Sequence, residues 1–424
     1  MNATNRIKLS VMFFLEYVIW GAWLPLLALY LGDDYLKFTG GQQAWIFNAF
    51  AIASLTGMFF GGQLADRYFS QEKFLAFSHF VGGLSILGLY YVKSFWPFFG
   101  LMLLHCFFYV PTLSITNAIA FANLKDAQKD FGFVRLWGTI GWIAASWPML
   151  FLPKGSVGMI FVFSGAASLL LAAYCLTLPH TPPAKNEGSS FAPLEAIRLL
   201  AIPSIAVLFV VTFFDSLTHY GYFFWTSPYL KTLGLPEKWI AAAMSIGQVM
   251  EIPAMAVLGW FLKHLGWRKT MTIGIAGQAV RFGMYSLGTP DLLWLVIGVN
   301  VVHGFAYACF FATVYIFVDE NFPKDVRSSA QSLFNLMILG IAPFASNSLW
   351  GWLKDSGVFK IATPGGTEGF AYHQLFLVPM GIAIFAAVLL ALFFHPPKKS
   401  EPVGVAELPG EPLPSEPSPM AAGG

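Results

Sequence analysis

Apolar stretches of about 20 residues follow one another along most of the chain, and this repetition limits the possible folds more than any other feature. A helix needs about 20 apolar residues to cross the hydrocarbon layer of a membrane. Of the 424 residues, 57% are hydrophobic and only 11% are charged, whereas a soluble domain has about 25% charged residues. The sequence therefore predicts a polytopic membrane protein. It excludes a soluble enzyme, a disordered chain and a nucleic-acid-binding protein.

Twelve membrane-spanning helices are predicted from these stretches. They cover residues 9–31, 43–64, 74–92, 95–119, 134–153, 157–178, 203–230, 239–262, 270–288, 291–318, 328–353 and 373–395. Apolar runs of this length exclude a β-barrel, whose strands alternate over about ten residues. The first run is too long for a cleaved signal peptide, contains Glu16 and lacks a small-residue cleavage site.

The distribution of positive charge predicts the orientation. With the N-terminus in the cytoplasm, the inside segments hold 15 lysines and arginines and the outside segments hold 7. Arg135 and Arg281 fall within predicted spans and complete the total of 24. Both termini are therefore predicted to be cytoplasmic.

A polar, proline-rich segment at residues 179–202 interrupts the apolar pattern. It predicts a central cytoplasmic loop between an N-terminal six-helix half at 1–178 and a C-terminal six-helix half at 203–395. Residues 396–424 are rich in Pro, Glu and Gly and are predicted to be a disordered cytoplasmic tail. An all-α integral membrane protein with this layout has the fold of the major facilitator superfamily, in which substrates bind near the midplane between the halves.

Ionisable side chains inside the predicted spans are candidates for function, because such groups are costly in lipid unless they face a partner or water. Glu16 shares a helix face with Trp20 and Trp23, at steps of four and three residues. This pattern indicates a protonatable carboxylate beside aromatic walls. The alternative is a solvated carboxylate near the inner membrane interface.

A second polar face opens the fifth predicted span. Arg135, Thr139 and Trp142 offer a cation, a hydroxyl and a ring on one helix face. Such a set fits a polar, planar, oxygen-rich solute. The alternative is an interfacial arginine whose charge reaches the lipid headgroups.

The eighth predicted span carries Gln248 and Glu251, just before Pro253. An amide and a carboxylate at this depth suit hydrogen bonds to sugar hydroxyls or to the edge of a base. The alternative is a buried polar pair that joins two helices. Pro253 removes a backbone hydrogen bond, so a kink is expected here.

Two further pairs have one-turn spacing. Asp215 and His219 lie in the seventh predicted span, where a carboxylate and an imidazole either relay a proton or form a structural pair. His303 and Tyr307 repeat the spacing in the tenth span and are candidate substrate-binding residues, with a structural histidine as the alternative for His303.

The remaining intramembrane polar residues are assigned structural roles. His79 and His105 are expected to be core histidines. Arg281 is expected to pair with a carboxylate on a neighbouring helix.

No catalytic residue, metal site or cofactor is predicted. The three cysteines lie in apolar runs without ligand spacing and are expected to be small core residues. The chain contains neither an H-E-x-x-H nor a G-x-S-x-G motif. A membrane enzyme is therefore not expected.

Several short motifs occur in a specific order across the twelve predicted spans. They are Phe14-Leu15-Glu16 with Trp20-Gly21-Ala22-Trp23, Leu64-Ala65-Asp66-Arg67, Tyr109-Val110-Pro111-Thr112 to Asn117, Arg135 to Trp142, Gln248 to Glu251, Val280-Arg281-Phe282, and Arg327-Ser328-Ser329-Ala330-Gln331. In these motifs the chain resembles the nucleoside/proton symporter family of the major facilitator superfamily. The resemblance excludes the tail.

The resemblance implies inward transport of nucleosides with protons. It implies that Arg135, Thr139 and Trp142 line the site. It also implies that Gln248 and Glu251 bind the nucleoside, with the ribose hydroxyls as their natural partners.

Four positions depart from the family pattern. Tyr220 and Phe223 stand where the family places polar amides, and they are taken as substrate-binding. Ala308 stands where the family commonly has an aspartate, while Tyr307 keeps the preceding aromatic residue. Glu16 occupies a position where relatives can have a glutamine.

These departures lead to a hypothesis about proton coupling. Glu16 or Asp215 replaces the missing aspartate, and Glu251 serves both proton and solute. The segment Gly62–Arg67 resembles the gating motif of the superfamily, so Asp66 and Arg67 are expected to control conformation rather than bind solute.

The leading prediction is proton-coupled nucleoside import by alternating access across a bacterial inner membrane, with a monomer as the superfamily default. A sugar or glycoside permease is the alternative on the same fold, because Tyr220 and Phe223 would suit stacking on a sugar ring. A non-transporting nucleoside sensor is a third reading. It would need a structured cytoplasmic domain, which the Pro-rich tail does not offer.

Overall fold

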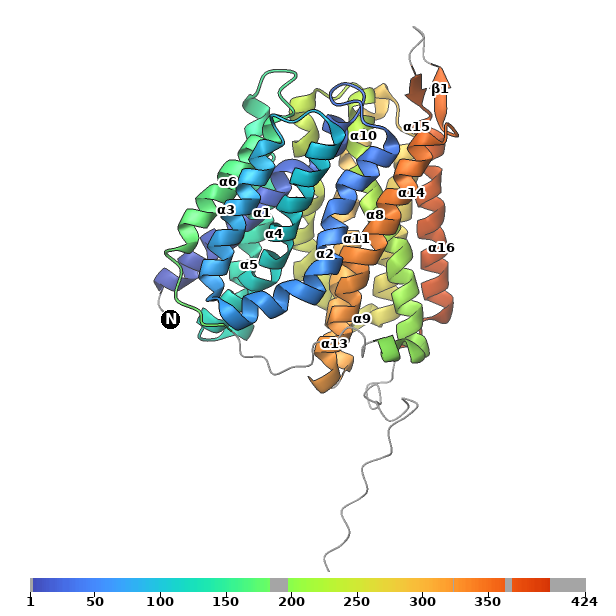
Figure 1. Ribbon diagram of the computed structural model, residues 1–424. Coiled ribbons are helices and arrows are strands. Elements are labelled where there is room, and N and C mark those ends of the chain that lie inside the picture. Colours follow the sequence, from blue (N-terminus) through green and yellow to red (C-terminus); the bar gives the residue numbers. More distant parts are fainter. Residues whose placement is uncertain (1–2, 184–196, 323, 363–367, 397–424) are drawn as a thin grey trace, which may run out of the picture.

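The computed structural model is a bundle of long helices (Figure 1). It describes residues 3–183, 197–322, 324–362 and 368–396. Within these ranges, no side chain is described at 58–68, 127–129, 324–326 and 328–329. Residues 184–196 of the predicted central loop and the predicted tail from residue 397 lie outside the described residues.

A first group of helices comes from the N-terminal part of the chain. It consists of α1 (Ala3–Leu31), α2 (Gly40–Tyr68), α3 (Gln71–Gly88), α4 (Phe95–Asn123), α5 (Ala127–Ala144), the short 3-10 helix η1 (Pro148–Phe151) and α6 (Met159–Cys175). In this group α1 packs against α5 and α6, α3 packs against α4 and α6, and α2 packs against α4.

The start of α2 shows how the sequence sets a helix end. Thr39 Oγ1 accepts a hydrogen bond from the Gln42 backbone N–H at 3.2 Å, and Gln42 Oε1 accepts one from the Thr39 N–H at 3.0 Å. This reciprocal cap satisfies two amides that the helix leaves free. It starts α2 three residues before the predicted position.

A second group comes from the rest of the chain. It consists of η2 (Ile197–Ala201), α8 (Pro203–Thr232), α9 (Glu237–Ser286), η3 (Pro290–Leu292), α10 (Leu293–Gly298), α11 (Val301–Tyr307), η4 (Ala308–Ala312), α12 (Thr313–Asn321), α13 (Lys324–Leu336), η5 (Met337–Ile341), α14 (Ala342–Asp355), β1 (Lys360–Ala362), β2 (Glu368–Phe370), α15 (Tyr372–Leu375) and α16 (Leu377–Phe393). Strands β1 and β2 form a small antiparallel pair that was not predicted.

The longest helix, α9, covers two of the predicted spans. Its backbone leaves the helical conformation at Gly266, with φ 71° and ψ 176°. Glycine adopts a positive φ readily because it has no Cβ. In the same group, η4 and η5 are single π-helical turns inside otherwise α-helical stretches.

The outer surface of the bundle is apolar. Large hydrophobic side chains such as Trp96, Leu176, Trp260 and Phe385 are more than half exposed. Among the described residues, seven helical stretches are long and apolar enough to cross a membrane. An apolar exterior of this extent suits contact with lipid.

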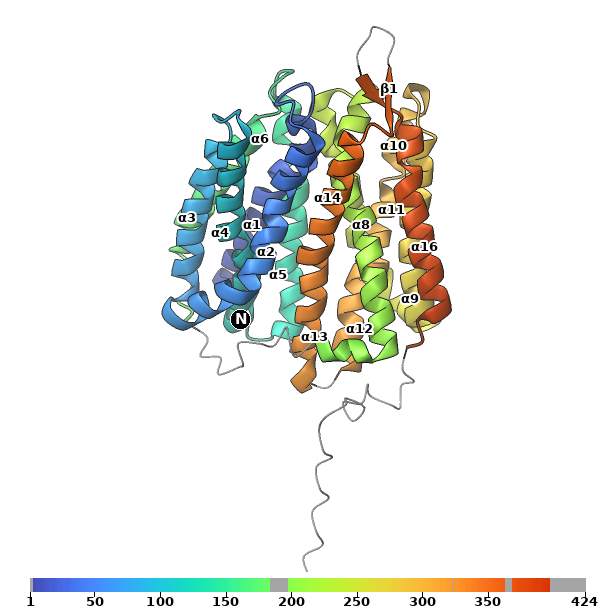
Figure 2. The same cartoon turned by 45° about the vertical axis from the view of Figure 1, so that its right-hand side comes forward.

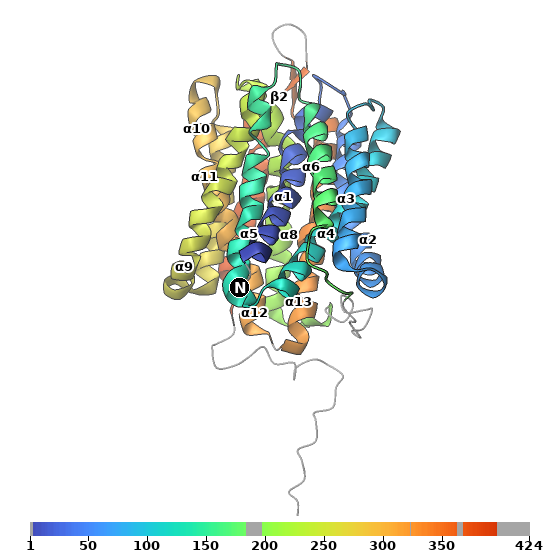
Figure 3. The same ribbon diagram turned by 90° about the vertical axis from the view of Figure 1, so that its left-hand side faces the viewer.

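The two groups meet along pairs of helices. Helix α2 lies beside α14, as Figures 1 and 2 show. Helix α5 lies beside α9 (Figure 3), and α1 contacts α8. The interior between these pairs is where side chains from both groups converge.

Candidate functional site

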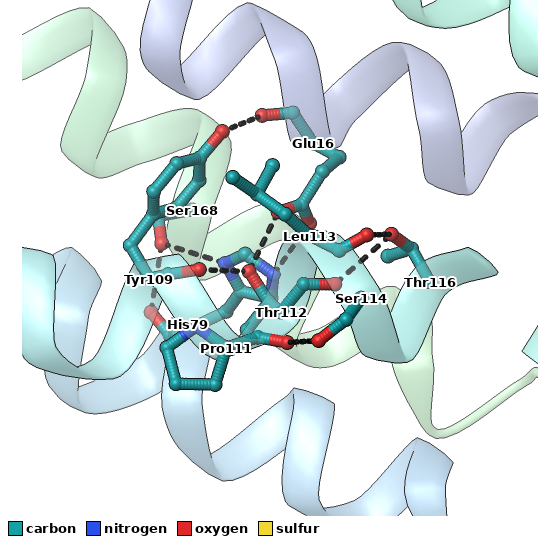
Figure 4. Close-up of polar contacts among 9 residues, drawn as sticks. All are labelled: Glu16, His79, Tyr109, Pro111, Thr112, Leu113, Ser114, Thr116 and Ser168. Carbon is teal, nitrogen blue, oxygen red and sulfur yellow. Dashed lines mark hydrogen bonds and ion pairs between the residues drawn. The ribbon is translucent and has the colours of Figure 1, made fainter. Parts of the chain in front are cut away.

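The carboxylate of Glu16 is completely buried inside the first group (Figure 4). Its Oε2 lies 2.8 Å from Nε2 of His79 on α3, and its Oε1 accepts a hydrogen bond from Thr112 Oγ1 on α4 at 2.6 Å. The Tyr109 hydroxyl donates to the Glu16 backbone carbonyl at 2.8 Å. Glu16 is thus an interior, paired carboxylate and not a solvated one at the membrane interface.

His79 continues this cluster toward α6. Its Nδ1 lies 3.3 Å from Ser168 Oγ, and the Ser168 hydroxyl donates to the His79 backbone carbonyl at 2.9 Å. Both side chains are almost fully buried. The cluster therefore joins α1, α3, α4 and α6 through polar contacts in an otherwise apolar interior.

Arg135 is held by an aromatic residue of α1. Its Nη2 donates to the Tyr17 hydroxyl at 2.8 Å, and its guanidinium carbon lies 4.1 Å from the centre of the Tyr17 ring. Gly138 makes room for this contact, because a Cβ there would lie 2.7 Å from the guanidinium and 2.8 Å from the ring. Arg135 is only half-buried, so part of its guanidinium remains available to a ligand.

Glu251, in the second group, interacts electrostatically with Arg135 in the first. Tyr307 and Tyr17 interact electrostatically with both residues. Glu251 is half-buried, and no hydrogen bond to its side chain is made by the described residues. Gln248 and Thr139 are also half-buried, and no described residue hydrogen-bonds to either side chain.

Aromatic rings surround these polar groups. Trp20 stacks on Phe50 with centroids 4.8 Å apart, and its edge contact with Trp142 spans 5.2 Å. Trp142 in turn contacts Phe223 of α8 at 6.4 Å, which crosses from the first group to the second. Flat apolar surfaces of this kind suit the faces of a base or a sugar.

The other predicted substrate residues of the second group are more engaged. The Tyr220 hydroxyl donates to the Ile338 backbone carbonyl at 2.9 Å. His303 is 3% exposed, is stacked between His219 and Tyr222, and is hydrogen-bonded to Arg281. The Tyr220 hydroxyl and the Nδ1 atom of His303 are therefore engaged by the protein itself. Tyr307 lies beside His219, with ring centroids 6.1 Å apart.

Asp215 and His219 do not hydrogen-bond to each other in the described part of the chain. Asp215 is 1% exposed, and neither carboxylate oxygen has a hydrogen-bond partner among the described residues. Arg281 interacts electrostatically with Asp215, but its hydrogen bonds go to His303 and to Gln278 Oε1. The bond to Gln278 is 2.6 Å long. The carboxylate partner expected for Arg281 is thus replaced by an imidazole and an amide.

Polar contacts between the two groups gather at the end of the bundle opposite the N-terminus. Asp355, at the end of α14, accepts hydrogen bonds from the backbone N–H groups of Gly40 and Gly41 at 2.6 and 2.7 Å. Slightly deeper, Asn48 bonds to Asn347 and Ser348, both at 3.1 Å. The Asp355 carboxylate therefore caps the N-terminus of α2, where the helix dipole favours negative charge.

A second set of contacts lies at the same end. The Tyr35 hydroxyl donates to Glu237 at 2.8 Å, and Lys231 bonds to both Glu237 and Asp34. Burial, followed by the hydrogen bond to Glu237, raises the pKa of Tyr35 above its ordinary value. Within the described residues, every hydrogen bond and ion pair between the two groups lies toward this end of the bundle.

The predicted gating residues lie in the last turns of α2, which runs to Tyr68. The side chains of Asp66 and Arg67 are outside the described part of the structure. No group of three or more His, Cys, Asp or Glu with the geometry of a metal site occurs among the described residues.

Two residues of the site were not singled out from the sequence. Tyr17 holds Arg135, and its place next to Glu16 and one turn before Trp20 was the available signal. His79 was expected to be a core histidine, and only the fold brings it to a carboxylate 63 positions away.

Comparison with known families decides the assignment. The model of the nucleoside H+ symporter family matches residues 1–399. The chain belongs to this family. It is an integral membrane protein of a family of transporters, and the described interior fits that role.

Curated relatives agree with the family. The putative nucleoside transporter YegT of Escherichia coli is 31% identical over 402 residues, which cover 92% of this chain and 93% of the relative. The xanthosine permease of the same organism is 28% identical over 92% of this chain and 97% of its own length.

Solved structures support the fold. A crystal structure of the nucleoside transporter NupG matches with a TM-score of 0.83 and 25% identity, over 92% of this chain and 100% of the other. The D-xylose-proton symporter matches with a TM-score of 0.68 and 14% identity, over 93% and 98% of the two chains. The fold is thus that of major facilitator transporters.

Proposed function

We propose that this chain imports nucleosides together with protons by alternating access across a bacterial inner membrane. Residues 1–178 and 203–395 form two six-helix halves joined by the segment 179–202, and the break of α9 at Gly266 separates two of the twelve spans. Both termini face the cytoplasm. The match of the nucleoside H+ symporter family over nearly the whole chain carries this proposal.

The nucleoside binds between Arg135 of the first half and Glu251 of the second. This assignment is supported by their electrostatic interaction and by the absence of a hydrogen bond to the Glu251 side chain from the described residues. Trp142 and Phe223 provide aromatic walls. A ligand that bonds to both charges draws the halves together, which links binding to conformational change.

Polar side chains around this pair extend the proposed site. Thr139 and Gln248 offer a hydroxyl and an amide that the described protein leaves unbonded. Tyr307 contributes a ring beside His219. Tyr220 and His303 are assigned to the wall of the site, because the Tyr220 hydroxyl and His303 Nδ1 already bond to the protein.

Glu16 is the proposed proton-binding carboxylate. Of the three candidates, it alone is both fully buried and hydrogen-bonded to described side chains, those of His79 and Thr112. Asp215 is buried without such partners, and Glu251 lies at the proposed nucleoside site. A proton site separate from the nucleoside site allows each to bias the conformation of the other.

A transport assay tests the function directly. Purified protein in proteoliposomes is expected to take up labelled uridine or adenosine, and an inward proton gradient is expected to drive accumulation. Unlabelled maltose or xylose should not compete. If sugars compete and no nucleoside enters, the protein is a sugar permease on the same fold.

Replacing Asp355 with alanine is expected to loosen the contacts between the halves at the end of the bundle opposite the N-terminus. In the proposed orientation this is the outer end, and these contacts hold it closed. The change removes two hydrogen bonds of 2.6 and 2.7 Å and the charge that caps α2. A cap of this kind contributes about 1 kcal/mol, so the open state should gain about fivefold in population. The measurement is the rate at which an impermeant maleimide outside labels Thr139→Cys, since the three native cysteines are buried.

Asp291→Ala is the matched control for this change. Asp291 is an exposed acid in the first turn of η3, and it makes no hydrogen bond or ion pair across the halves within the described residues. Its loss should leave labelling unchanged. Equal labelling in the Asp355 and Asp291 variants would show that the cap does not hold the outer end closed.

A further inference from the structure

His79 and Ser168 extend the proton site, on the basis of the proposed role of Glu16. We propose that Glu16 and His79 bind the coupling proton as one unit, and that Ser168 holds His79 in the tautomer that this unit requires. His79 is then a proton-binding residue, and Ser168 is a positioning residue. The polar contacts of these three side chains are shown in Figure 4.

The hydrogen bonds of Ser168 define the tautomer of His79. A serine hydroxyl has one hydrogen, and Ser168 donates it to the His79 backbone carbonyl at 2.9 Å. Its oxygen is therefore left to accept from His79 Nδ1, which lies 3.3 Å away. Nδ1 consequently carries a hydrogen, and Nε2 is the nitrogen that faces Glu16.

The contact between Nε2 and Glu16 Oε2, at 2.8 Å, then contains a single proton. Either a neutral imidazole accepts it from the carboxylic acid, or an imidazolium donates it to the carboxylate. Both forms hold the same number of protons and have no net charge. A neutral pair is what burial demands, because Glu16 and His79 are 0% and 1% exposed.

Loss of this proton is opposed in the observed conformation. It would leave a carboxylate facing the bare lone pair of Nε2, with both side chains buried. Relief requires the imidazole hydrogen to move from Nδ1 to Nε2, which breaks the contact with Ser168. The geometry therefore links release of the proton to a rearrangement of α1, α3 and α6, as proton-coupled transport requires.

No other titratable group near the pair takes over the role of Glu16 or of His79. These groups are Tyr17 on α1, His105, Cys106 and Tyr109 on α4, Arg135 on α5 and Cys175 on α6. The Tyr109 hydroxyl bonds to a backbone carbonyl, and Arg135 bonds to Tyr17. Among the described residues, only Glu16 offers His79 a carboxylate.

A double-mutant cycle tests the unit. Glu16→Gln, His79→Gln and the double variant are assayed in proteoliposomes for gradient-driven accumulation of labelled uridine and for uridine exchange without a gradient. Each single variant is expected to lose at least fivefold in accumulation while exchange persists. The double variant should lose no more than either single variant, because residues that act as a unit are not additive.

His105→Gln is the matched control. His105 is a fully buried histidine in the same half, and its Nδ1 contacts the Gly82 carbonyl at 2.9 Å instead of a carboxylate. Its replacement should lower accumulation and exchange by the same factor, if at all. If His79→Gln behaves like His105→Gln, or if the losses of the two singles multiply in the double variant, the unit does not exist.

Ser168→Ala tests the tautomer and keeps the proposal open to refutation if the His79 variant does not fold. Without the hydroxyl, the Nε2–H tautomer can face an ionised Glu16, so the proton is held less tightly. The pH of half-maximal accumulation is expected to move about 0.5 to 1 unit lower, with exchange preserved. An unchanged pH profile would refute the role of Ser168. Absence of uridine exchange in the unmodified protein would instead refute the proposed function itself.

Discussion

Replacing Arg135 with lysine is expected to lower nucleoside uptake at subsaturating concentration by about 10- to 100-fold. The guanidinium carbon lies 4.1 Å from the centre of the Tyr17 ring, Nη2 bonds to the Tyr17 hydroxyl, and the charge interacts electrostatically with Glu251. A lysine ammonium is a point charge that cannot stack and bind in two directions at once. Lost hydrogen bonds to a charged group cost about 1.5 to 3 kcal/mol, which gives this range.

The kinetic signature of this loss is a raised KM for uridine. Arg6→Lys is the matched control, because the Arg6 guanidinium also stacks on a ring, that of Phe133 at 4.1 Å, but lies outside the proposed site. It should stay within twofold of the unmodified protein. Uptake by the Arg135 variant that equals uptake by the Arg6 variant would exclude Arg135 from nucleoside binding.

The helices could be predicted largely because lipid imposes a simple rule on composition. The predicted starts at 95 and 203 coincide with the first residues of α4 and α8. Errors arise where local chemistry outweighs hydropathy. The Thr39 cap starts α2 early, and the π-helical turns η4 and η5 have no hydropathy signal.

The site could be predicted only where one helix contains its parts. The face of Arg135 and Trp142 follows from helical spacing, and the structure turns both toward the second half. The partner of Glu16 could not be predicted, since His79 meets it through the packing of α1 against neighbouring helices. Packing also brings His303 of α11 to Arg281, whereas the second hydrogen-bond partner, Gln278, lies one turn away on α9 itself.

Replacing Glu16 with glutamine is expected to abolish proton-driven accumulation and to leave nucleoside exchange. The amide is nearly the same shape and can keep contacts with Thr112 and His79, but it cannot release or take up a proton. A gradient of one pH unit supplies about 1.4 kcal/mol per coupled proton, or about tenfold accumulation. In the variant this ratio should fall to about one.

Glu72→Gln is the control that separates coupling from folding. Glu72 is also a buried carboxylate paired with a histidine, His180, at 2.8 Å, but it lies at the start of α3 and away from the proposed nucleoside site. Its loss should reduce the amount of folded protein without changing the accumulation ratio. If Glu16→Gln still accumulates uridine while Asp215→Asn does not, the coupling carboxylate is Asp215, and the buried cluster around His79 serves only to hold the first half together.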